Sequence, residues 1–195
     1  MRIDDYNKGF YIEESGKRRY VPGVYEMDEL AQEVVKQMEE AHFRPDLILA
    51  IENGGTMPAW KIDHYHIEKT RHIPTVASMR LKSYSKTNCL EDKRGELTLF
   101  YNTTPKNYIT KKVLIVDDLL DSGKTAERAF ELVYDWFGDD VCVELGVLWW
   151  KYCSSIMPNF YGKCVGRVWI LLPKDQERPR KELFAKSVTP SCKSE

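Results

Sequence analysis

VLIVDDLLDSGKTAERA, residues 113–129, is the most informative stretch of this sequence. Four apolar residues run directly into two aspartates, and a short turn of small and hydroxyl-bearing residues follows. An apolar run of this kind is typical of a strand in a parallel sheet that is covered on both faces. Ligands of open parallel sheets bind beyond the carboxyl ends of the strands, where the acidic pair would lie. The segment therefore predicts a strand, a ligand-binding turn and a helix.

The turn after the strand has the chemistry of a phosphate site. It opens a helix, whose free N–H groups and positive dipole end suit an anion. Gly123 lets the backbone approach a ligand closely, while Ser122 and Thr125 add hydroxyl donors. The carboxylates of Asp117 and Asp118 stand one strand end away, where they can bind sugar hydroxyls or Mg²⁺. Phosphate at the turn and carboxylates beside it describe a ribose-phosphate site.

Three other interpretations of this segment are weaker. A nucleotide-binding P-loop needs a glycine five positions before Gly123, and Asp118 stands there. A phosphoacceptor receiver domain carries such an acidic pair at the end of its first strand, not at residue 117. A purely structural strand, turn and helix would place three acids in five positions after an apolar strand, which is costly without a ligand.

Strands and helices alternate on both sides of this segment. Short apolar or β-branched runs predict strands, and stretches with apolar residues at helical spacing predict helices. This order indicates an α/β domain with a mostly parallel central sheet flanked by helices and joined by right-handed crossovers. The predicted strands are LILAI (47–51), TVASMRL (75–81), ELTLFY (96–101, at or near an edge), KVLIVDDL (112–119), VCVELGVLWW (141–150) and RVWILL (167–172); the predicted helices begin near residues 28, 57 and 126.

The composition narrows the class of protein. The 195 residues are 43% hydrophobic and 30% charged, which excludes a membrane protein and a disordered chain. The 29 basic residues almost cancel the 30 acidic ones, so no net charge favours a nucleic-acid partner. No apolar run reaches the roughly 18 residues of a membrane span, and the start of the chain has no signal core. Five cysteines without a CxxC pair indicate reduced thiols, so we expect a cytoplasmic protein.

The two close histidines, His64 and His66, are the one pattern suggestive of a metal ligand pair. A plausible third ligand is missing nearby in the sequence. We therefore interpret both histidines as solvated residues at a helix end.

VLIVDDLLDSGKT, 13 residues long, resembles the phosphoribosyl-pyrophosphate signature of the type I phosphoribosyltransferases. The resemblance extends from about residue 45 to about residue 175. It implies the type I phosphoribosyltransferase fold with a small hood, as a single domain over 1–195. In that scheme about 1–25 form an N-terminal arm or short hairpin, about 82–95 a mobile loop and about 152–180 the hood region.

Two further segments agree with this family. ILAIENGGTMPA (48–59) resembles the strand and glycine loop that hold pyrophosphate, which implies that role for Asn53, Gly54 and Gly55. MRLKSYSK (79–86) resembles the start of the mobile catalytic loop of the hypoxanthine-guanine enzymes, with Ser83 and Tyr84 on its serine–tyrosine pair. Without the resemblance, the same two residues would read as an ordinary polar loop.

The segments WWK (149–151) and VWILLPKD (168–175) resemble the base-binding strand and hood of the 6-oxopurine branch. The resemblance implies that Lys151 binds the exocyclic oxygen, that Trp169 stacks on the purine beside Ile170, and that Asp175 contributes to metal binding. A lysine donates hydrogen bonds and accepts none, so Lys151 would favour a 6-oxo over a 6-amino group. Trp169 taken alone fits a core position equally well.

The resemblance implies transfer of a phosphoribosyl group from phosphoribosyl pyrophosphate to hypoxanthine, guanine or xanthine, giving a nucleoside monophosphate and pyrophosphate in purine salvage. Asp117 and Asp118 would hold the ribose hydroxyls, directly or through Mg²⁺. Asp121 would take the proton from N7 of the purine. The 5′-phosphate would be cradled by Asp121, Ser122, Gly123, Lys124 and Thr125. By the same resemblance the protein would be a homo-dimer or homo-tetramer, with no nucleic-acid or membrane partner.

Two departures from the family pattern leave alternatives open. The family usually has a basic residue where this chain has Asn53, and the hood reads LLPKD without a second aromatic residue after its proline. One alternative is a phosphoribosyltransferase for another base. The other is a non-catalytic regulator that senses phosphoribosyl pyrophosphate or nucleotides, which Asn53 favours. Asp121, Lys151 and Trp169 favour the enzyme, because a sensor of the sugar phosphate alone needs no purine pocket.

Overall fold

The computed structural model describes residues 9–14, 16–23, 25–81, 96–99 and 110–172. The chain forms two compact units. The larger unit spans Met27–Arg167, and the smaller one combines Met1–Glu26 with Val168–Glu195. We describe each unit by itself.

The larger unit contains a six-stranded sheet with the strand order β5-β4-β3-β6-β7-β8. All neighbours pair in parallel except β4 and β5, which are antiparallel. This confirms the predicted α/β class, and β5 lies at the edge where its alternating sequence predicted it. The strands are β3 (Leu47–Ile51), β4 (Thr75–Arg80), β5 (Glu96–Leu99), β6 (Lys112–Leu120), β7 (Cys142–Lys151) and β8 (Phe160–Val165).

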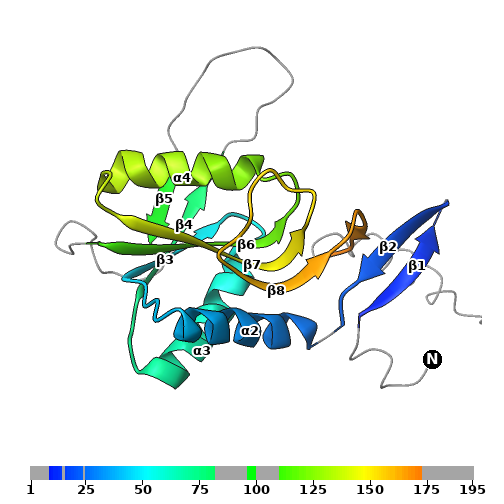
Figure 1. The fold of residues 1–195 in the computed structure, drawn as a ribbon, viewed down its shortest axis with the longest axis horizontal. Coiled ribbons are helices and arrows are strands. Elements are labelled where there is room, and N and C mark those ends of the chain that lie inside the picture. The colour runs from blue at the N-terminus through cyan, green and yellow to red at the C-terminus, as the bar shows by residue number, and fades with distance from the viewer. Residues whose placement is uncertain (1–8, 15, 24, 82–95, 100–109, 173–195) are drawn as a thin grey trace, which may run out of the picture. The chain divides into compact units, whose positions relative to one another are not determined.

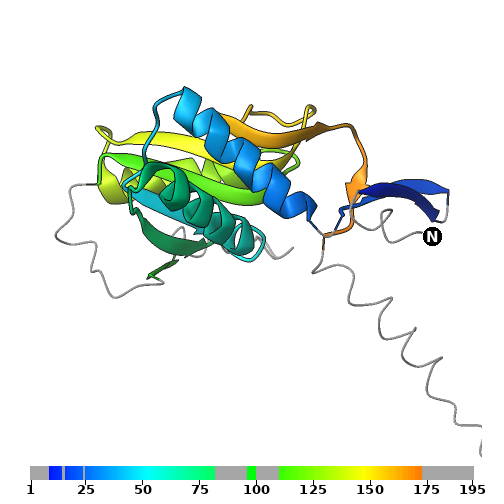
Figure 2. The ribbon, with the colours of Figure 1, turned by 90° about the horizontal axis from the view of Figure 1, so that it is seen from below.

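Helices cover both faces of this sheet (Figures 1 and 2). Helix α4 (Lys124–Phe137) lies on one face, and α2 (Glu26–Glu40) and α3 (Thr56–Thr70) lie on the other. Helix α3 contacts β3, β4 and β6. The apolar runs of the central strands are explained by this arrangement, because each strand has a helix layer on either side. All five residues of β3 are buried.

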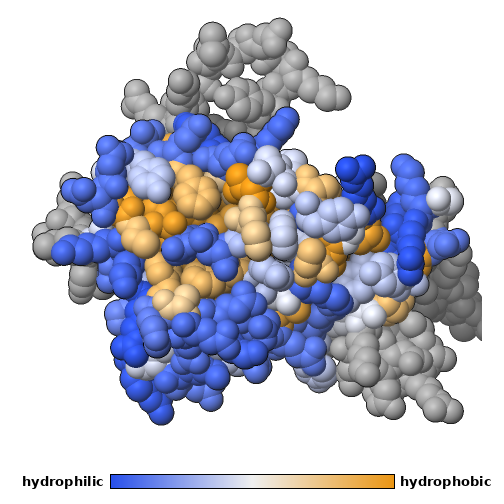
Figure 3. Space-filling view, viewed as in Figure 1, coloured by the Kyte–Doolittle hydropathy of each residue, from blue (hydrophilic) through white to orange (hydrophobic). Residues whose placement is uncertain are grey.

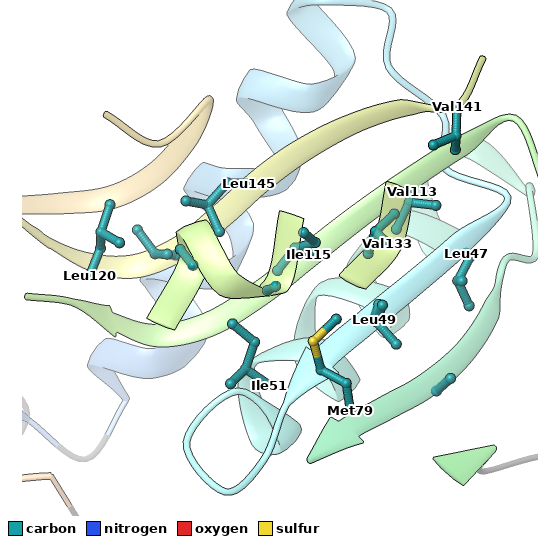
Figure 4. Packing of buried hydrophobic residues seen from close by; sticks show 14 residues of the cluster. Leu47, Leu49, Ile51, Met79, Val113, Ile115, Leu120, Val133, Val141 and Leu145 are labelled. Atoms are coloured by element: carbon teal, nitrogen blue, oxygen red, sulfur yellow. The ribbon is translucent and has the colours of Figure 1, made fainter. Parts of the chain in front are cut away.

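The face under α4 holds the main hydrophobic cluster (Figure 4). Alternate residues of four parallel strands point toward this helix, since successive side chains of a strand face opposite sides of the sheet. The helix contributes its own apolar stripe between them. The cluster consists of Leu47, Leu49, Ile51, Ala77, Met79, Val113, Ile115, Leu120, Ala126, Ala129, Val133, Val141, Leu145 and Val147.

Helix α2 buries the apolar stripe that its spacing predicts. Five residues at helical intervals are at most 8% exposed, and they are Leu30, Ala31, Val34, Val35 and Met38. On the same helix, the Gln37 side chain donates to the carbonyl of Tyr161 (2.8 Å) and accepts from the Tyr161 N–H (3.0 Å). These bonds fix α2 against strand β8, which the sequence did not predict.

Two glycines of the sheet lie near α2, and only one of them is needed for the close approach of the helix. A Cβ atom at Gly162 of β8 would lie 2.5 Å from Cβ of Leu30 and 2.8 Å from the carbonyl of Leu148. A Cβ atom at Gly146 of β7 would meet only side-chain atoms, the nearest 3.3 Å away on Leu114. Gly162 therefore permits a close helix–strand contact, and Gly146 leaves room for a methyl group.

The β8 side of the sheet comes to the surface between the two helix layers. Seen from that side, apolar side chains gather over the strands, and the flanking surfaces of α4 and α2 are hydrophilic (Figure 3). Partly buried hydrophobic residues packed against the main cluster include Phe130, Trp136, Phe137, Val143, Trp150 and Tyr161.

The smaller unit contains a three-stranded sheet, β1-β2-β9. Strands β1 (Phe10–Glu14) and β2 (Lys17–Val21) form an antiparallel hairpin, and β9 (Trp169–Ile170) pairs with β2 in parallel. The hairpin is one of the two forms expected for the first 25 residues. The last predicted strand, 167–172, is present as the two residues of β9, which pair with β2 in the smaller unit. The edge strand of the main sheet beside β7 is β8, which was not predicted, because its sequence FYGKCV lacks the apolar run that marks a buried strand.

The histidine interpretation was wrong for one of its two residues. His64 is exposed, but His66 is fully buried on the sheet side of α3. Burial lowers the pKa of His66 to about 4 and raises the pKa of Asp63, one turn earlier, to about 6. His66 lies edge-on to the ring of His72, with 5.7 Å between the centroids.

No helix in the described ranges is long and apolar enough to cross a membrane. Among the described residues, Cys142, Cys153 and Cys164 are exposed free thiols.

The two sheet glycines give a matched pair of variants. We expect Gly162→Ala to lower the free energy of unfolding by about 1–3 kcal/mol, because the new methyl group meets the α2 backbone and a strand carbonyl. Gly146→Ala should change it by less than about 1 kcal/mol, since only flexible side-chain ends stand nearby. Urea unfolding of both variants measures the difference. Equal losses would mean that α2 does not lie this close to β8.

Buried His66 predicts a pH-dependent contribution to stability. Its folded pKa is below the unfolded value, so neutral His66 contributes stability above about pH 6.5 that is lost as the pH falls toward 4. We expect the stability of the parent relative to His66→Met to fall by about 3 kcal/mol over this range, at roughly 1.4 kcal/mol per pKa unit. Denaturant unfolding at several pH values checks this.

The exposed neighbour provides the control for that experiment: His64→Met should show no comparable dependence. Asp63 has a raised pKa and acts with the opposite sign, losing stability as the pH rises through about 6. It keeps its His64 neighbour in the parent and in His66→Met, whereas His64→Met also removes a charge that lowers the pKa of Asp63. If the free energy of unfolding differed between the parent and His66→Met by the same amount from pH 4 to pH 6.5, the burial of His66 would be contradicted.

Candidate functional site

Three loops meet at the carboxyl edge of the central strands. The glycine loop (residues 52–55) follows β3, the DSGKT turn (residues 121–125) follows β6, and the β7–β8 loop (residues 152–159) follows β7. These strands are adjacent and parallel, with Ala50 opposite Val116 and Val116 opposite Gly146. Parallel pairing therefore brings segments that are about 30 to 100 residues apart to one edge of the sheet.

Asp118 lies directly against the glycine loop. A Cβ atom at Gly54 would stand 2.4–2.5 Å from the carboxyl group of Asp118, which is 7% exposed as a residue. A Cβ atom at Gly55 would stand 2.2 Å from the carbonyl of Val116. Both positions need glycine because the loop folds onto the end of β6. The structure thus brings together two segments that the sequence predicted as parts of one site.

Asp117 has a different environment from its neighbour. Successive residues of a strand point to opposite faces, so the two carboxyl groups leave β6 in different directions. The Asp117 carboxylate accepts the backbone N–H of Asp118 at 2.8 Å, and the residue is half-buried. The acidic pair therefore divides its contacts: Asp118 borders the glycine loop, and Asp117 fixes the backbone at the strand end.

An acid that the sequence analysis missed begins the glycine loop. The Glu52 carboxylate accepts hydrogen bonds from the Ser78 hydroxyl (2.6 Å) and from Nε of Arg80 (3.0 Å). The bond from Ser78, and then the Arg80 guanidinium, hold the pKa of Glu52 below its ordinary value. The peptide between Glu52 and Asn53 is cis, and Asn53 is exposed. Arg80 thus brings a cation to this loop. At position 53 of the same loop, this chain has Asn53 instead of the basic residue usual in the family.

The residues predicted to bind and deprotonate the base form an ion pair. Nζ of Lys151, at the end of β7, lies 2.8 Å from a carboxylate oxygen of Asp121 in the DSGKT turn. The Lys151 side chain is only 8% exposed, whereas that of Asp121 is 56% exposed. A buried ammonium needs such a partner, because an unpaired charge in the interior is costly. The pair connects the end of β7 with the turn after β6.

The DSGKT turn is open to solvent. Asp121, Ser122, Lys124 and Thr125 are exposed, and Gly123 has a positive φ of 91°. Gly123 is also the N-cap of α4, so the turn ends where the helix presents its first N–H groups. A glycine conformation, exposed hydroxyl groups and a helix N-terminus suit an anion such as phosphate.

The β7–β8 loop folds back onto this turn, which no sequence pattern indicated. Ser155 bonds to the carbonyl of Ser122 and to the carboxylate of Glu127. A Cβ atom at Gly123 would stand 2.3 Å from the Ser155 hydroxyl and 3.0 Å from that of Ser154. These contacts are between residues about 30 positions apart, and only the three-dimensional structure reveals them.

The other predicted site residues belong to the smaller unit or lie outside the described residues. Trp169 and Ile170 form β9 in the smaller unit, where the Trp169 side chain is exposed (60%) and Ile170 is buried. Ser83, Tyr84 and Asp175 lie outside the described residues. Within the described part of the chain, no group of three or more His, Cys, Asp or Glu side chains could hold a metal ion.

A twisted parallel sheet with a glycine loop, an acidic strand end and a helix-opening turn at one edge defines a nucleotide-type ligand site on an α/β fold. The phosphoribosyl transferase domain model matches residues 22–172. Since this match covers more than half of the chain, the protein belongs to the phosphoribosyl transferase domain family. No protein of curated function matches the chain significantly.

Several solved structures are similar to this chain. The purine phosphoribosyltransferase from Pyrococcus horikoshii Ot3 shares 22% identity over 90% of this chain and 97% of its own, with a TM-score of 0.58. A hypothetical protein from Neisseria gonorrhoeae with bound ppGpp shares 20% identity over 84% and 93%, with a TM-score of 0.58. The Helicobacter pylori xanthine-guanine-hypoxanthine phosphoribosyltransferase shares 16% identity over 78% and 89%, with a TM-score of 0.57. At these identities the likeness shows the fold.

The ion pair predicts unequal effects of removing its two partners. Asp121→Asn should lower the free energy of unfolding by about 1–2 kcal/mol, because it leaves the buried Lys151 ammonium without its carboxylate, while the exposure of Asp121 softens the loss. Lys151→Met should change stability less, since it replaces a buried charge with an apolar side chain of similar length. Denaturant unfolding measures both.

The control for this pair is Asp139→Asn. Asp139 is an exposed acid after α4, and its substitution should stay within about 0.5 kcal/mol of the parent. If Asp121→Asn were as stable as this control, the pairing of Lys151 with Asp121 would be refuted.

Proposed function

We propose that the protein transfers a phosphoribosyl group from phosphoribosyl pyrophosphate to a 6-oxopurine base, namely hypoxanthine, guanine or xanthine. The products are the nucleoside monophosphate and pyrophosphate. The observation that carries this proposal is the ion pair between Lys151 and Asp121, 2.8 Å long, beside the DSGKT turn. It holds a donor for a purine oxygen and an acceptor for a purine proton next to the site for the sugar phosphate.

The sugar phosphate is bound in two parts. The DSGKT turn receives the 5′-phosphate, with its hydroxyl groups, Lys124 and the first N–H groups of α4 as donors. Asp117 and Asp118 face the ribose hydroxyls at the strand end. Little covalent work falls to the protein, because carbon 1 of the ribose develops positive charge as pyrophosphate leaves. Positioning and charge stabilisation therefore supply most of the rate.

The acidic strand end fits Mg²⁺. Mg²⁺ prefers oxygen ligands and is usually held by one or two carboxylates together with substrate phosphates and water. Asp117 and Asp118 supply two carboxylates, and Asp118 lies against the glycine loop proposed for pyrophosphate. When bound, the ion neutralises negative charge on the pyrophosphate leaving group.

The pyrophosphate is proposed to bind at the glycine loop, where a basic residue of the family is replaced by Asn53. Arg80, which bonds to Glu52 at the start of this loop and is 62% exposed as a side chain, supplies positive charge from the neighbouring strand β4. A charge-assisted bond from a guanidinium suits a phosphate oxygen. This contribution from Arg80 supports turnover despite Asn53.

The choice of base follows from hydrogen-bond chemistry. The Lys151 ammonium donates to the 6-oxygen of hypoxanthine, guanine or xanthine, whereas the 6-amino group of adenine presents donors in return. Asp121 accepts a proton at N7 while it remains paired with Lys151. Trp169 is proposed to stack on the purine.

A second candidate function is a non-catalytic regulator that binds phosphoribosyl pyrophosphate or a nucleotide. Asn53 in the glycine loop favours it, because the missing basic residue weakens leaving-group stabilisation. The similar Neisseria gonorrhoeae protein was solved with ppGpp, a guanine nucleotide. Binding without turnover distinguishes this candidate from the enzyme.

A spectrophotometric assay of each purine with phosphoribosyl pyrophosphate and Mg²⁺ tests the proposal. We expect turnover of at least one 6-oxopurine and little of adenine. Lys151→Met should lower kcat/KM for that base by roughly 10²-fold or more, since a site that bonds one polar group discriminates strongly when the bond is lost. Affinity for phosphoribosyl pyrophosphate should change little.

The melting temperature of Lys151→Met is the control, because an unchanged value shows that the loss is not unfolding. Parent-like turnover by this variant would remove Lys151 from the base site. Absence of turnover with every base, together with calorimetric binding of phosphoribosyl pyrophosphate, would reject the enzyme in favour of the regulator.

A further inference from the structure

Ser155 in the β7–β8 loop is bound to the DSGKT turn by its backbone and its side chain. Its N–H donates to the carbonyl of Ser122 at 3.1 Å. Its hydroxyl oxygen lies 2.9 Å from the same carbonyl and 2.6 Å from Oε1 of Glu127 in the first turn of α4. The hydroxyl has one proton for two acceptors, and the charged carboxylate forms the stronger bond. The hydroxyl therefore anchors the loop to α4, and the amide holds the Ser122 carbonyl.

This contact fixes the orientation of one peptide in the turn. The peptide between Ser122 and Gly123 is trans, so its C=O and N–H point in opposite directions. Because the carbonyl of Ser122 points to Ser155, the N–H of Gly123 points away from the β7–β8 loop. The contact thus selects the orientation in which this donor faces away from the β7–β8 loop, next to the exposed residues of the DSGKT turn.

The turn needs such a contact because glycine does not choose the orientation by itself. Gly123 has φ of 91°, and rotating the preceding peptide by half a turn brings φ to a negative value that glycine adopts about as readily. The close packing of Ser154 and Ser155 on Gly123 also excludes any side chain at this position. Gly123 is therefore required for the close approach of a ligand, but it also permits the wrong orientation of the Ser122–Gly123 peptide.

We propose that Ser155 is a positioning residue for phosphate binding: it holds the Ser122–Gly123 peptide with the Gly123 N–H available to the 5′-phosphate. This inference rests on the proposed function, in which the DSGKT turn receives that phosphate. Preorganised donors bind more tightly because the ordering cost is met before the ligand arrives. Loss of the Ser155 hydroxyl releases the β7–β8 loop from Glu127, so the Ser155 amide holds the Ser122 carbonyl less firmly. It therefore weakens phosphate binding without altering the chemistry of the base.

The test uses the full chain and ribose 5-phosphate as the probe. Isothermal calorimetry measures its Kd, and steady-state kinetics give KM for phosphoribosyl pyrophosphate and kcat separately. We expect Ser155→Ala to raise both Kd and KM by roughly three- to tenfold, as for the loss of one well-placed hydrogen bond, with kcat and the melting temperature little changed. Ser155→Thr, which keeps the hydroxyl, should restore parent values.

Ser154→Ala is the matched control. Its hydroxyl accepts the N–H of Ile156 within its own loop, so its loss should leave Kd as in the parent. The amide resonance of Gly123 in ¹⁵N-labelled protein gives an independent readout: exchange between two peptide orientations should broaden or split it in Ser155→Ala and not in Ser154→Ala. If Ser155→Ala fails to fold, Ser155→Cys, with a weak donor of similar size, provides the same comparison.

The outcomes separate this inference from the function on which it rests. If the parent binds ribose 5-phosphate and the Ser155 variant binds it equally well, the positioning role is overturned and the proposed function stands. If the parent does not bind the probe, both are overturned. A raised Kd in Ser155→Ala with restoration by Ser155→Thr supports the positioning role.

Discussion

Burial of the central strands on both faces is the constraint on which the rest of this structure depends. Strands β3, β6 and β7 have a helix layer on either side, so a polar group within them would be cut off from water. The polar groups of the candidate site accordingly gather toward the end of each strand. Because the strands are parallel and adjacent, these points lie at one edge. The glycine loop, the DSGKT turn and the end of β7 are together for this reason.

The Lys151 ammonium is a buried charge at the end of β7, and its ion pair joins this strand end to the turn after β6. A charge on a side chain that is 8% exposed is costly without a partner, and Asp121 provides one from the neighbouring turn. Ser155 adds a second connection to the same turn a few residues later. The segment after β7 and the turn after β6 thus support each other, although neither has a hydrophobic core of its own.

The fold and part of the site could be predicted because their signals are local. The apolar run before Asp117, the helical spacing around Val34 and the turn at Gly123 each depend on neighbours in sequence. Strand β8 was missed because an edge strand beside α2 needs no apolar run. The bond of Arg80 to Glu52 and that of Ser155 to Ser122 depend on chain segments that meet only after folding. Burial of His66 likewise depends on the placement of α3, because its neighbours in sequence are a mixture of polar and apolar residues.

Gln37 has a consequence for how molecules of this protein can associate. An edge strand offers backbone groups that a second chain can pair with, and proteins commonly block such templates to avoid aggregation. At Tyr161 of β8 both groups are already taken, the N–H and the carbonyl each by the amide of Gln37. A foreign strand would have to displace a side chain held by the packed helix α2. One glutamine thus works against extension of the sheet from one molecule into the next.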